Sequence, residues 1–194
     1  MNKIRTAVLT GTLAWASFVV VPAPVLAQAS GAVEASAETW PTADPEDVAS
    51  IDAVIAALYD VISGPAGQKR DWDRFKSLMA PQARLIPTGQ GPGGVVGYQA
   101  WSPGQYASQA GAFLEERGFF EVESARTTEE FGQIAHAFST YESRWTLEDE
   151  EPFDRGINSI QLLNDGERWW IMTIFWAAES SGLTIPNRYL RSRR

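Results

Sequence analysis

The sequence predicts an α+β fold, in which three helices interleaved with two short strands precede a four-stranded antiparallel sheet. Up to about Arg117 the apolar residues recur at three- and four-residue spacing, which is typical of helices that bury one face. After Gly118 the apolar period changes to two residues, the period of β-strands. The connections between the later strands are too short for a crossover helix, so neighbouring strands are expected to run antiparallel.

The first predicted helix covers residues 44–62. Asp44 supplies an N-cap side chain, and Pro45 follows at the first helical position, where a missing N–H costs nothing. The helix is expected to stop at Gly64 and Pro65. Its apolar face consists of Ile51, Val54, Ile55, Leu58, Tyr59 and Ile62.

Two further helices are predicted before the main sheet. The second begins at Asp71, and the proline that follows it ends it. The third runs from Ser102, another cap followed by proline, to about Arg117. Brief strands are expected at 83–86 and 95–101. The apolar side of the second helix carries Trp72, Phe75, Leu78 and Met79.

The last two strands are predicted to form a hairpin. Asp165 and Gly166 suit a two-residue turn, which would pair Leu162 with Trp169. Both faces of the final strand are then apolar, one carrying Trp169, Ile171 and Phe175 and the other Trp170, Met172, Ile174 and Trp176. Since the helices can cover only one face, the other face predicts a homodimer through the sheet. The four strands of the sheet are expected at 119–130, 134–145, 156–163 and 168–178.

Composition excludes several classes of function. The chain has 194 residues, enough for one domain, and its net charge is −8, which disfavours binding to nucleic acid. It has no cysteine and a single histidine, so neither a disulfide framework nor a thiolate metal site is expected. No cofactor and no metal site are predicted.

The N-terminus has the pattern of a secretory signal. Lys3 and Arg5 precede an apolar stretch of about 15 residues, which is shorter than a bilayer requires. Cleavage is predicted after Ala27, giving a periplasmic or secreted protein without a stable membrane anchor; an uncleaved anchor is the alternative. The resulting division is a signal peptide at 1–27, a flexible linker at 28–43, the domain at 44–179 and a C-terminal tail at 180–194.

The order of elements over 44–179 resembles the nuclear transport factor 2-like superfamily, in its SnoaL-like (polyketide-cyclase-like) branch. The most specific pieces are the second helix, leading through Pro81 into a small residue and a strand, and the terminal Asp-Gly hairpin with Trp169 and Ile171. The resemblance implies a cone, in which a strongly curved antiparallel sheet wraps the three helices around an apolar pocket. It also implies a homodimer through the convex sheet face, and it does not imply a reaction.

His136 is the first candidate for catalysis. A histidine titrates near neutral pH and suits a general base, and Tyr141, Asn158 or Arg155 would then polarise an oxygen atom of the substrate. The alternative is a histidine hydrogen-bonded within a half-buried strand. The side chains predicted to line the pocket are Tyr59, Trp72, Phe75, Tyr98, Trp101, Phe113 and Arg155.

Two local motifs do not carry a function. The glycine-rich loop 89–94 matches a nucleotide-binding pattern, but a strand rather than a helix follows it. The acidic loop 148–151 lacks the alternating ligands of a calcium site. Three hypotheses remain: an exported domain that binds a small apolar or aromatic molecule, a lyase or isomerase that uses His136, and a dimeric protein-interaction module.

Overall fold

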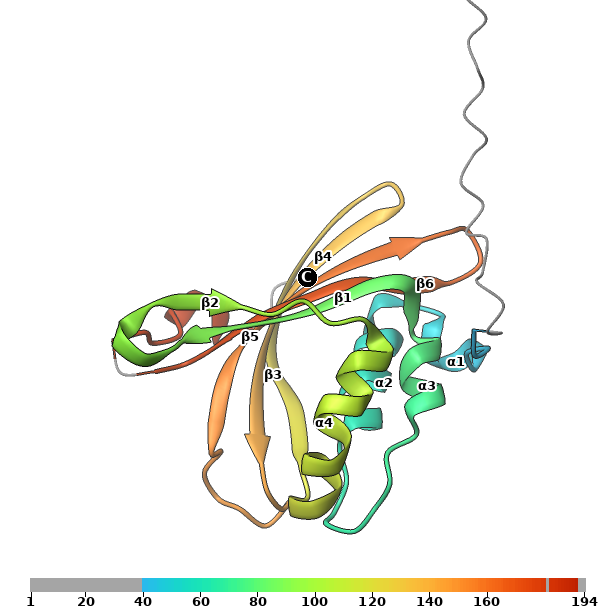
Figure 1. Cartoon of the computed structure of the whole chain (residues 1–194). Coiled ribbons are helices and arrows are strands. Elements are labelled where there is room, and N and C mark those ends of the chain that lie inside the picture. Colours follow the sequence, from blue (N-terminus) through green and yellow to red (C-terminus); the bar gives the residue numbers. More distant parts are fainter. Residues whose placement is uncertain (1–39, 181, 192–194) are drawn as a thin grey trace, which may run out of the picture. The chain divides into compact units, whose positions relative to one another are not determined.

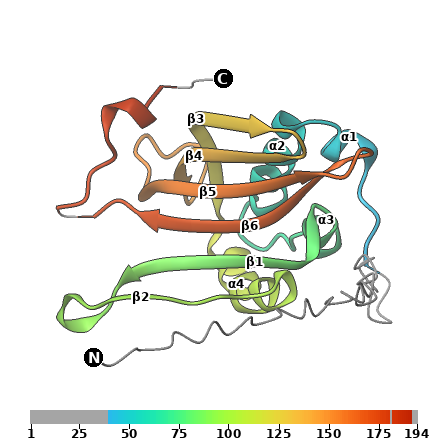
Figure 2. The same ribbon diagram turned by 90° about the horizontal axis from the view of Figure 1, so that it is seen from above.

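The computed structural model describes residues 40–180 and 182–191, so the predicted signal peptide and most of the predicted linker lie outside the described residues. Helices pack on one face of a six-stranded sheet with strand order β2-β1-β6-β5-β4-β3, as Figures 1 and 2 show. The predicted α+β class is confirmed. The strands are β1 (Met79–Gln90), β2 (Val96–Tyr98), β3 (Phe120–Phe131), β4 (Ile134–Arg144), β5 (Asp154–Asn164) and β6 (Trp169–Ala178).

The helices begin where cap chemistry predicts. The first predicted helix is divided in two, because the Ser50 hydroxyl accepts from the Ala53 N–H at 3.0 Å and starts a new helix. At the start of the last long helix, Ser102 and Gln105 form a capping box. The helices are α1 (Pro45–Val48), α2 (Ile51–Ile62), α3 (Trp72–Ser77) and α4 (Pro103–Arg117), with short 3-10 turns at η1 (Pro92–Gly94) and η2 (Asn187–Tyr189).

The sheet is mixed rather than wholly antiparallel. Strands β3 to β6 form the predicted antiparallel meander, but β1 pairs with β6 in parallel, with Leu85 opposite Ile174. Strand β1 is also longer than the predicted 83–86 and passes through Pro81. Proline is tolerated there because this part of β1 has a strand neighbour on one side only.

The predicted register of the last hairpin is wrong. Asn164 rather than Leu162 lies opposite Trp169, because the turn is a four-residue loop in which the Asp165 carboxylate accepts from the Glu167 and Arg168 N–H groups. A bulge at Met172 then inserts one extra residue into β6 and reverses the alternation of its side chains. The stripe that faces the helices is therefore Trp169, Ile171, Ile174 and Trp176, and the outer stripe is Trp170, Met172 and Phe175.

The core lies between α2 and the middle of the sheet. Val54, Leu58 and Ile160 are almost fully buried there, and burying each such side chain stabilises the fold by about 1.5–3 kcal/mol. Arg70 joins the helices at one end, since its buried guanidinium donates to the backbone carbonyls of Ile62, Gly64, Gln68 and Leu114. In the described part of the chain, no helix is long and apolar enough to cross a membrane.

Both ends of the described chain pack against the domain. The Trp40 indole donates to the Met79 carbonyl at 2.9 Å and Ala43 is buried, so these described residues of the predicted linker belong to the domain. In the predicted tail, the Tyr189 carbonyl accepts from the Thr140 hydroxyl at 2.6 Å. The C-terminal segment therefore packs on the outer face of the sheet, against β4.

Candidate functional site

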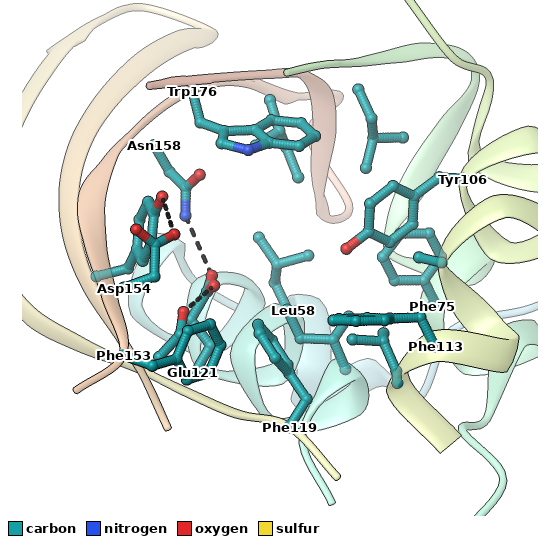
Figure 3. A pocket seen from close by; sticks show the side chains of 17 residues that line it. Leu58, Phe75, Tyr106, Phe113, Phe119, Glu121, Phe153, Asp154, Asn158 and Trp176 are labelled. Carbon is teal, nitrogen blue, oxygen red and sulfur yellow. Dashed lines mark hydrogen bonds between the residues drawn. The ribbon is translucent and has the colours of Figure 1, made fainter. Parts of the chain in front are cut away.

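A cavity of about 290 Å³ lies between α2, α4 and the inner face of the sheet. Figure 3 shows its labelled side chains surrounding one open space. Most of its wall is apolar, and the polar side chains gather on the β3, β4 and β5 side. The lining residues are Leu58, Ile62, Phe75, Leu85, Tyr106, Ala110, Phe113, Leu114, Phe119, Glu121, Tyr141, Ser143, Phe153, Asp154, Asn158, Ile174 and Trp176. We call this space the inner cavity.

Two carboxyl groups and a hydroxyl of the inner cavity come from one row across three strands. Glu121 on β3 lies opposite Ser143 on β4, which lies opposite Asp154 on β5. The Ser143 hydroxyl donates to Glu121 Oε2 at 3.0 Å, and Asn158 Nδ2 approaches Glu121 Oε1 at 3.4 Å. The Tyr141 hydroxyl donates to Asp154 Oδ2 at 3.3 Å. Two carboxyl groups therefore face the same cavity, each with hydrogen-bond donors.

Burial changes the protonation of these acids. It raises the pKa of Glu121 from 4.5 to about 7, an effect that the hydrogen bonds from Ser143 and Asn158 oppose and the charge of Asp154 reinforces. Burial likewise raises the pKa of Asp154. Glu121 keeps some accessible surface because it faces the cavity, although protein atoms surround its carboxyl closely. Its carboxyl can therefore donate or accept a proton near neutral pH.

A chain of hydrogen bonds holds Asn158 in place. The Ser139 hydroxyl donates its proton to Glu123, so its oxygen accepts from the Tyr59 hydroxyl at 2.7 Å. The Tyr59 oxygen in turn accepts from Asn158 Nδ2 at 3.1 Å. The amide nitrogen of Asn158 thus lies between Tyr59 and Glu121. Gly156 leaves room for the Tyr141 ring in this region, because a Cβ on Gly156 would lie 2.5 Å from the Tyr141 hydroxyl.

Aromatic rings form the opposite wall. Tyr106 stacks on Phe75 at a centroid distance of 5.3 Å and meets Trp176 edge to face at 6.4 Å. Its hydroxyl points into the cavity (Figure 3), and among the described residues it has no hydrogen-bond partner. Burial raises the pKa of Tyr106, so the phenol stays protonated and can donate a hydrogen bond. At the rim, Phe113, Phe119 and Phe153 complete the aromatic lining.

The structure brings together some of the predicted site residues. Tyr141, Asn158, Phe75 and Phe113 line the inner cavity. Three more predicted pocket residues lie behind the wall of the inner cavity. Tyr59 is buried beneath Asn158, while Trp72 and Trp101 pack on Tyr106. Tyr98 is 74% exposed on the hairpin of β1 and β2, outside the cavity. The sequence predicts a shorter β1. In the structure β1 extends to Gln90 and pairs there with β2, which places Tyr98 away from the pocket.

The structure does not place His136, the predicted general base, in the inner cavity. On β4 the inward positions are Ala135, Ala137 and the later odd-numbered residues, so His136 faces outward. Its Nε2 shares a hydrogen bond of 2.9 Å with the Ser159 hydroxyl. Arg155 also faces outward, where it pairs with Glu179 at 2.7 Å. The alternation along a strand does not by itself indicate which face meets the helices.

The sequence analysis missed Glu121, Asp154, Ser143 and Tyr106. A signal for Glu121 was present, because Glu121 and Glu123 alternate with Phe120 and Val122 and therefore share one face of a strand. Its role depends on the register of three strands, which the alternation alone does not supply. Among the described residues, no group of three or more acidic, histidine or cysteine side chains is placed to hold a metal ion.

Comparisons with known proteins identify the fold. No family model and no curated protein matches the sequence. A cystatin-like protein of unknown function from Nostoc punctiforme matches with a TM-score of 0.51 and 14% identity, over 68% of this chain and 90% of that one. An NTF2-like protein of unknown function from Pseudomonas putida matches with a TM-score of 0.51 and 12% identity, over 70% and 90%. A third structure, also of unknown function, from Mycobacterium tuberculosis, has a TM-score of 0.50 and 13% identity, over 71% and 75%.

At such low identity these likenesses concern the fold alone. The chain has the α+β fold of NTF2-like proteins.

Proposed function

We propose that the inner cavity binds a small, flat and largely apolar molecule that carries one polar group. The observation that carries this proposal is the Glu121 carboxyl, with a pKa raised to about 7, on one side of a cavity whose other walls are aromatic and aliphatic. Ligand pockets characteristically combine an apolar wall with a few convergent polar groups. The volume of about 290 Å³ suits a molecule of one or two rings.

The polar group of the ligand is expected to be a hydroxyl or a carbonyl. A protonated Glu121 donates to a carbonyl, whereas the ionised form accepts from a hydroxyl. The Tyr106 hydroxyl offers a second hydrogen bond from the opposite wall. The ring of the ligand would then lie beside Tyr106 and Trp176, in contact with their aromatic surfaces.

A matched pair of ligands tests this proposal. 2-Naphthol and naphthalene differ by one hydroxyl, and their binding is measured by quenching of tryptophan fluorescence. Wild-type protein is expected to prefer 2-naphthol by about tenfold, the equivalent of about 1.4 kcal/mol. Glu121→Leu should abolish the preference and retain naphthalene binding, while Glu142→Gln, on the outer face, should change neither. Equal binding of both ligands to wild-type protein would contradict the proposal.

A lyase or isomerase is the second candidate. Its support is that Glu121, next to Asp154, titrates near neutral pH, as a group that removes a proton from carbon requires. Exchange of the α-protons of 2-tetralone in heavy water, followed by NMR, tests this. The catalysed rate should rise with pH, level off above about 7 and vanish in Glu121→Gln. Exchange that is equally fast with the variant would exclude Glu121 as the base.

A dimeric interaction module is the third candidate. One row of the outer sheet face is apolar on each strand from β3 to β6. Its residues lie side by side in register and are Phe131, Ile134, Leu163 and Trp170. Phe131 is 84% exposed and Ile134 60% exposed, and such a patch favours pairing with a second copy. Light scattering on wild-type protein and on Phe131→Ser should give a dimer and a monomer, respectively.

Export is a further proposal. It is supported by the basic start, the short apolar stretch and the small residues before position 28. Mass spectrometry of protein recovered from the periplasm or the medium should give a chain that begins at or near Gln28. An intact Met1 on the mature protein would contradict cleavage.

A further inference from the structure

A second cavity, of about 220 Å³, lies on the other side of the same strands. Its floor is the outer face of β4, β5 and β6, with Phe138, Ile157 and Phe175. Its cover is the C-terminal segment, with Leu183, Ile185 and Pro186. We call this space the outer cavity.

The C-terminal segment is anchored on both sides of the outer cavity. On one side, Glu179 accepts from the Ile185 N–H at 2.8 Å and pairs with Arg155 at 2.7 Å. On the other, the Tyr189 carbonyl accepts from the Thr140 hydroxyl at 2.6 Å, and the Tyr189 ring contacts Phe138 at a centroid distance of 4.8 Å. These contacts hold the intervening residues over the sheet while leaving space beneath them.

The polar side chains on the sheet side of the outer cavity already have protein partners. The Thr88 hydroxyl donates to the Trp176 carbonyl at 2.7 Å, and Ser159 shares its hydrogen bond with His136. The Glu179 carboxylate holds Arg155 and Ile185. A water molecule needs two to four polar partners, so this site favours an apolar occupant over water.

We propose that the outer cavity is a second binding site, which takes an uncharged aromatic ring or a short branched hydrocarbon. A cavity of about 150 Å³ with aliphatic and aromatic walls is large enough for benzene, so the outer cavity has room for a substituted ring. The ligand needs no polar group, because the polar side chains on the sheet side of the cavity are already bonded to the protein. This site is separate from the one proposed above, since the sheet lies between the two cavities.

Filling each cavity in turn tests the proposal. Ala177 lines the outer cavity from β6, and Ala110 lines the inner cavity from α4. The probe is hexafluorobenzene, followed by fluorine NMR and by the methyl signals of Leu183 and Ile185. In wild-type protein the probe should shift both methyl signals. Ala177→Phe should weaken this binding at least tenfold and leave the binding of 2-naphthol unchanged.

Ala110→Phe is the matched control. It should weaken binding of 2-naphthol and leave the response of Leu183 and Ile185 to hexafluorobenzene intact. If either large residue prevents folding, Ala177→Leu and Ala110→Leu repeat the comparison with smaller additions. The proposal is overturned if the probe leaves the Leu183 and Ile185 signals unchanged, or if Ala177→Phe binds it as tightly as wild-type protein does.

Discussion

The inner and outer cavities are lined by opposite faces of the same strands and differ in chemistry. Asn158 and Trp176 point into the inner cavity, while their neighbours Ile157 and Phe175 contribute to the outer one. Two carboxyl groups and a phenol face the inner cavity, whereas the polar side chains on the sheet side of the outer cavity are bonded to the protein. Because side chains alternate along a strand, the same strands can build a site with polar groups on one face and an apolar site on the other.

The largest expected difference between the two faces is in stability. Phe75→Ala removes a ring that is 1% exposed and stacked on Tyr106, which should cost about 3–5 kcal/mol and lower Tm by about 10 °C. Phe175→Ala removes a ring that is 47% exposed on the outer face, so its cost should stay below about 1 kcal/mol. Thermal unfolding of both variants measures this, and equal losses would contradict the assignment of the core to the inner face.

A pH dependence of stability is expected from Glu121 in the inner cavity. The pKa of Glu121 in the folded chain, about 7, exceeds its ordinary value of 4.5, so the native state binds more protons between these values. The free energy of unfolding should therefore fall as pH rises from about 4.5 to 7. Between pH 5 and pH 8 the loss should be about 2 kcal/mol larger in wild-type protein than in Glu121→Gln.

Denaturant titrations at pH 5 and pH 8 measure this difference. Glu142→Gln is the control, since this outer carboxylate is paired with Arg144 and lies outside the cavity. Asp154 and Glu123 are present in all three proteins and contribute to the pH dependence of each. The difference between the proteins therefore reports on Glu121. A loss of the same size in Glu121→Gln would show that the carboxyl is not desolvated.

His136→Ala should produce a smaller effect, confined to the outer face. The change removes the hydrogen bond to Ser159 and should cost about 1 kcal/mol, or about 2–4 °C in Tm. Binding of 2-naphthol in the inner cavity should not change, because the sheet separates the imidazole from it. A variant that folds normally but loses 2-naphthol binding would restore His136 to the functional site.

The smallest effect on stability is expected at the anchor of the C-terminal segment. Glu179→Gln weakens the ion pair with Arg155, whose side chain is 38% exposed, and should cost less than about 1 kcal/mol. Binding of hexafluorobenzene should nevertheless weaken, because the cover of the outer cavity loses one anchor. Calorimetry together with fluorine NMR separates the two effects, and unchanged probe affinity would show that this anchor does not shape the site.

The sequence predicted features that depend on neighbouring residues. The helix starts at Asp44 and Ser102 follow from capping chemistry within one turn, and the even-numbered side chains of β4 do share a face. The wrong predictions concern features that depend on residues far apart in the sequence. The extra residue at Met172 adds no turn signal, yet it moves Ile174 and Trp176 to the inner face.

The candidate site was harder to predict than the fold. The pKa of Glu121 is raised mainly because the fold buries its carboxyl, and the register of β3, β4 and β5 adds the nearby charge of Asp154. A second bulge, at Ser124, lets Arg126 as well as Glu123 face inward, which simple alternation does not permit. His136 was favoured because its residue type suits catalysis, although residue type alone does not say which face of a strand a side chain occupies.

The position of β6 also constrains the order in which the chain can assemble. β6 is the last strand to be synthesised, but it lies between β1 and β5 and joins the two parts of the sheet. Until it is available, β1 and β2 form one fragment and β3 to β5 another, each with an open edge. Contacts between residues so distant in sequence slow folding, so a nascent chain stays without its central strand until synthesis passes residue 178. Until β6 joins them, the open edges of β1 and β5 leave the growing chain exposed to aggregation.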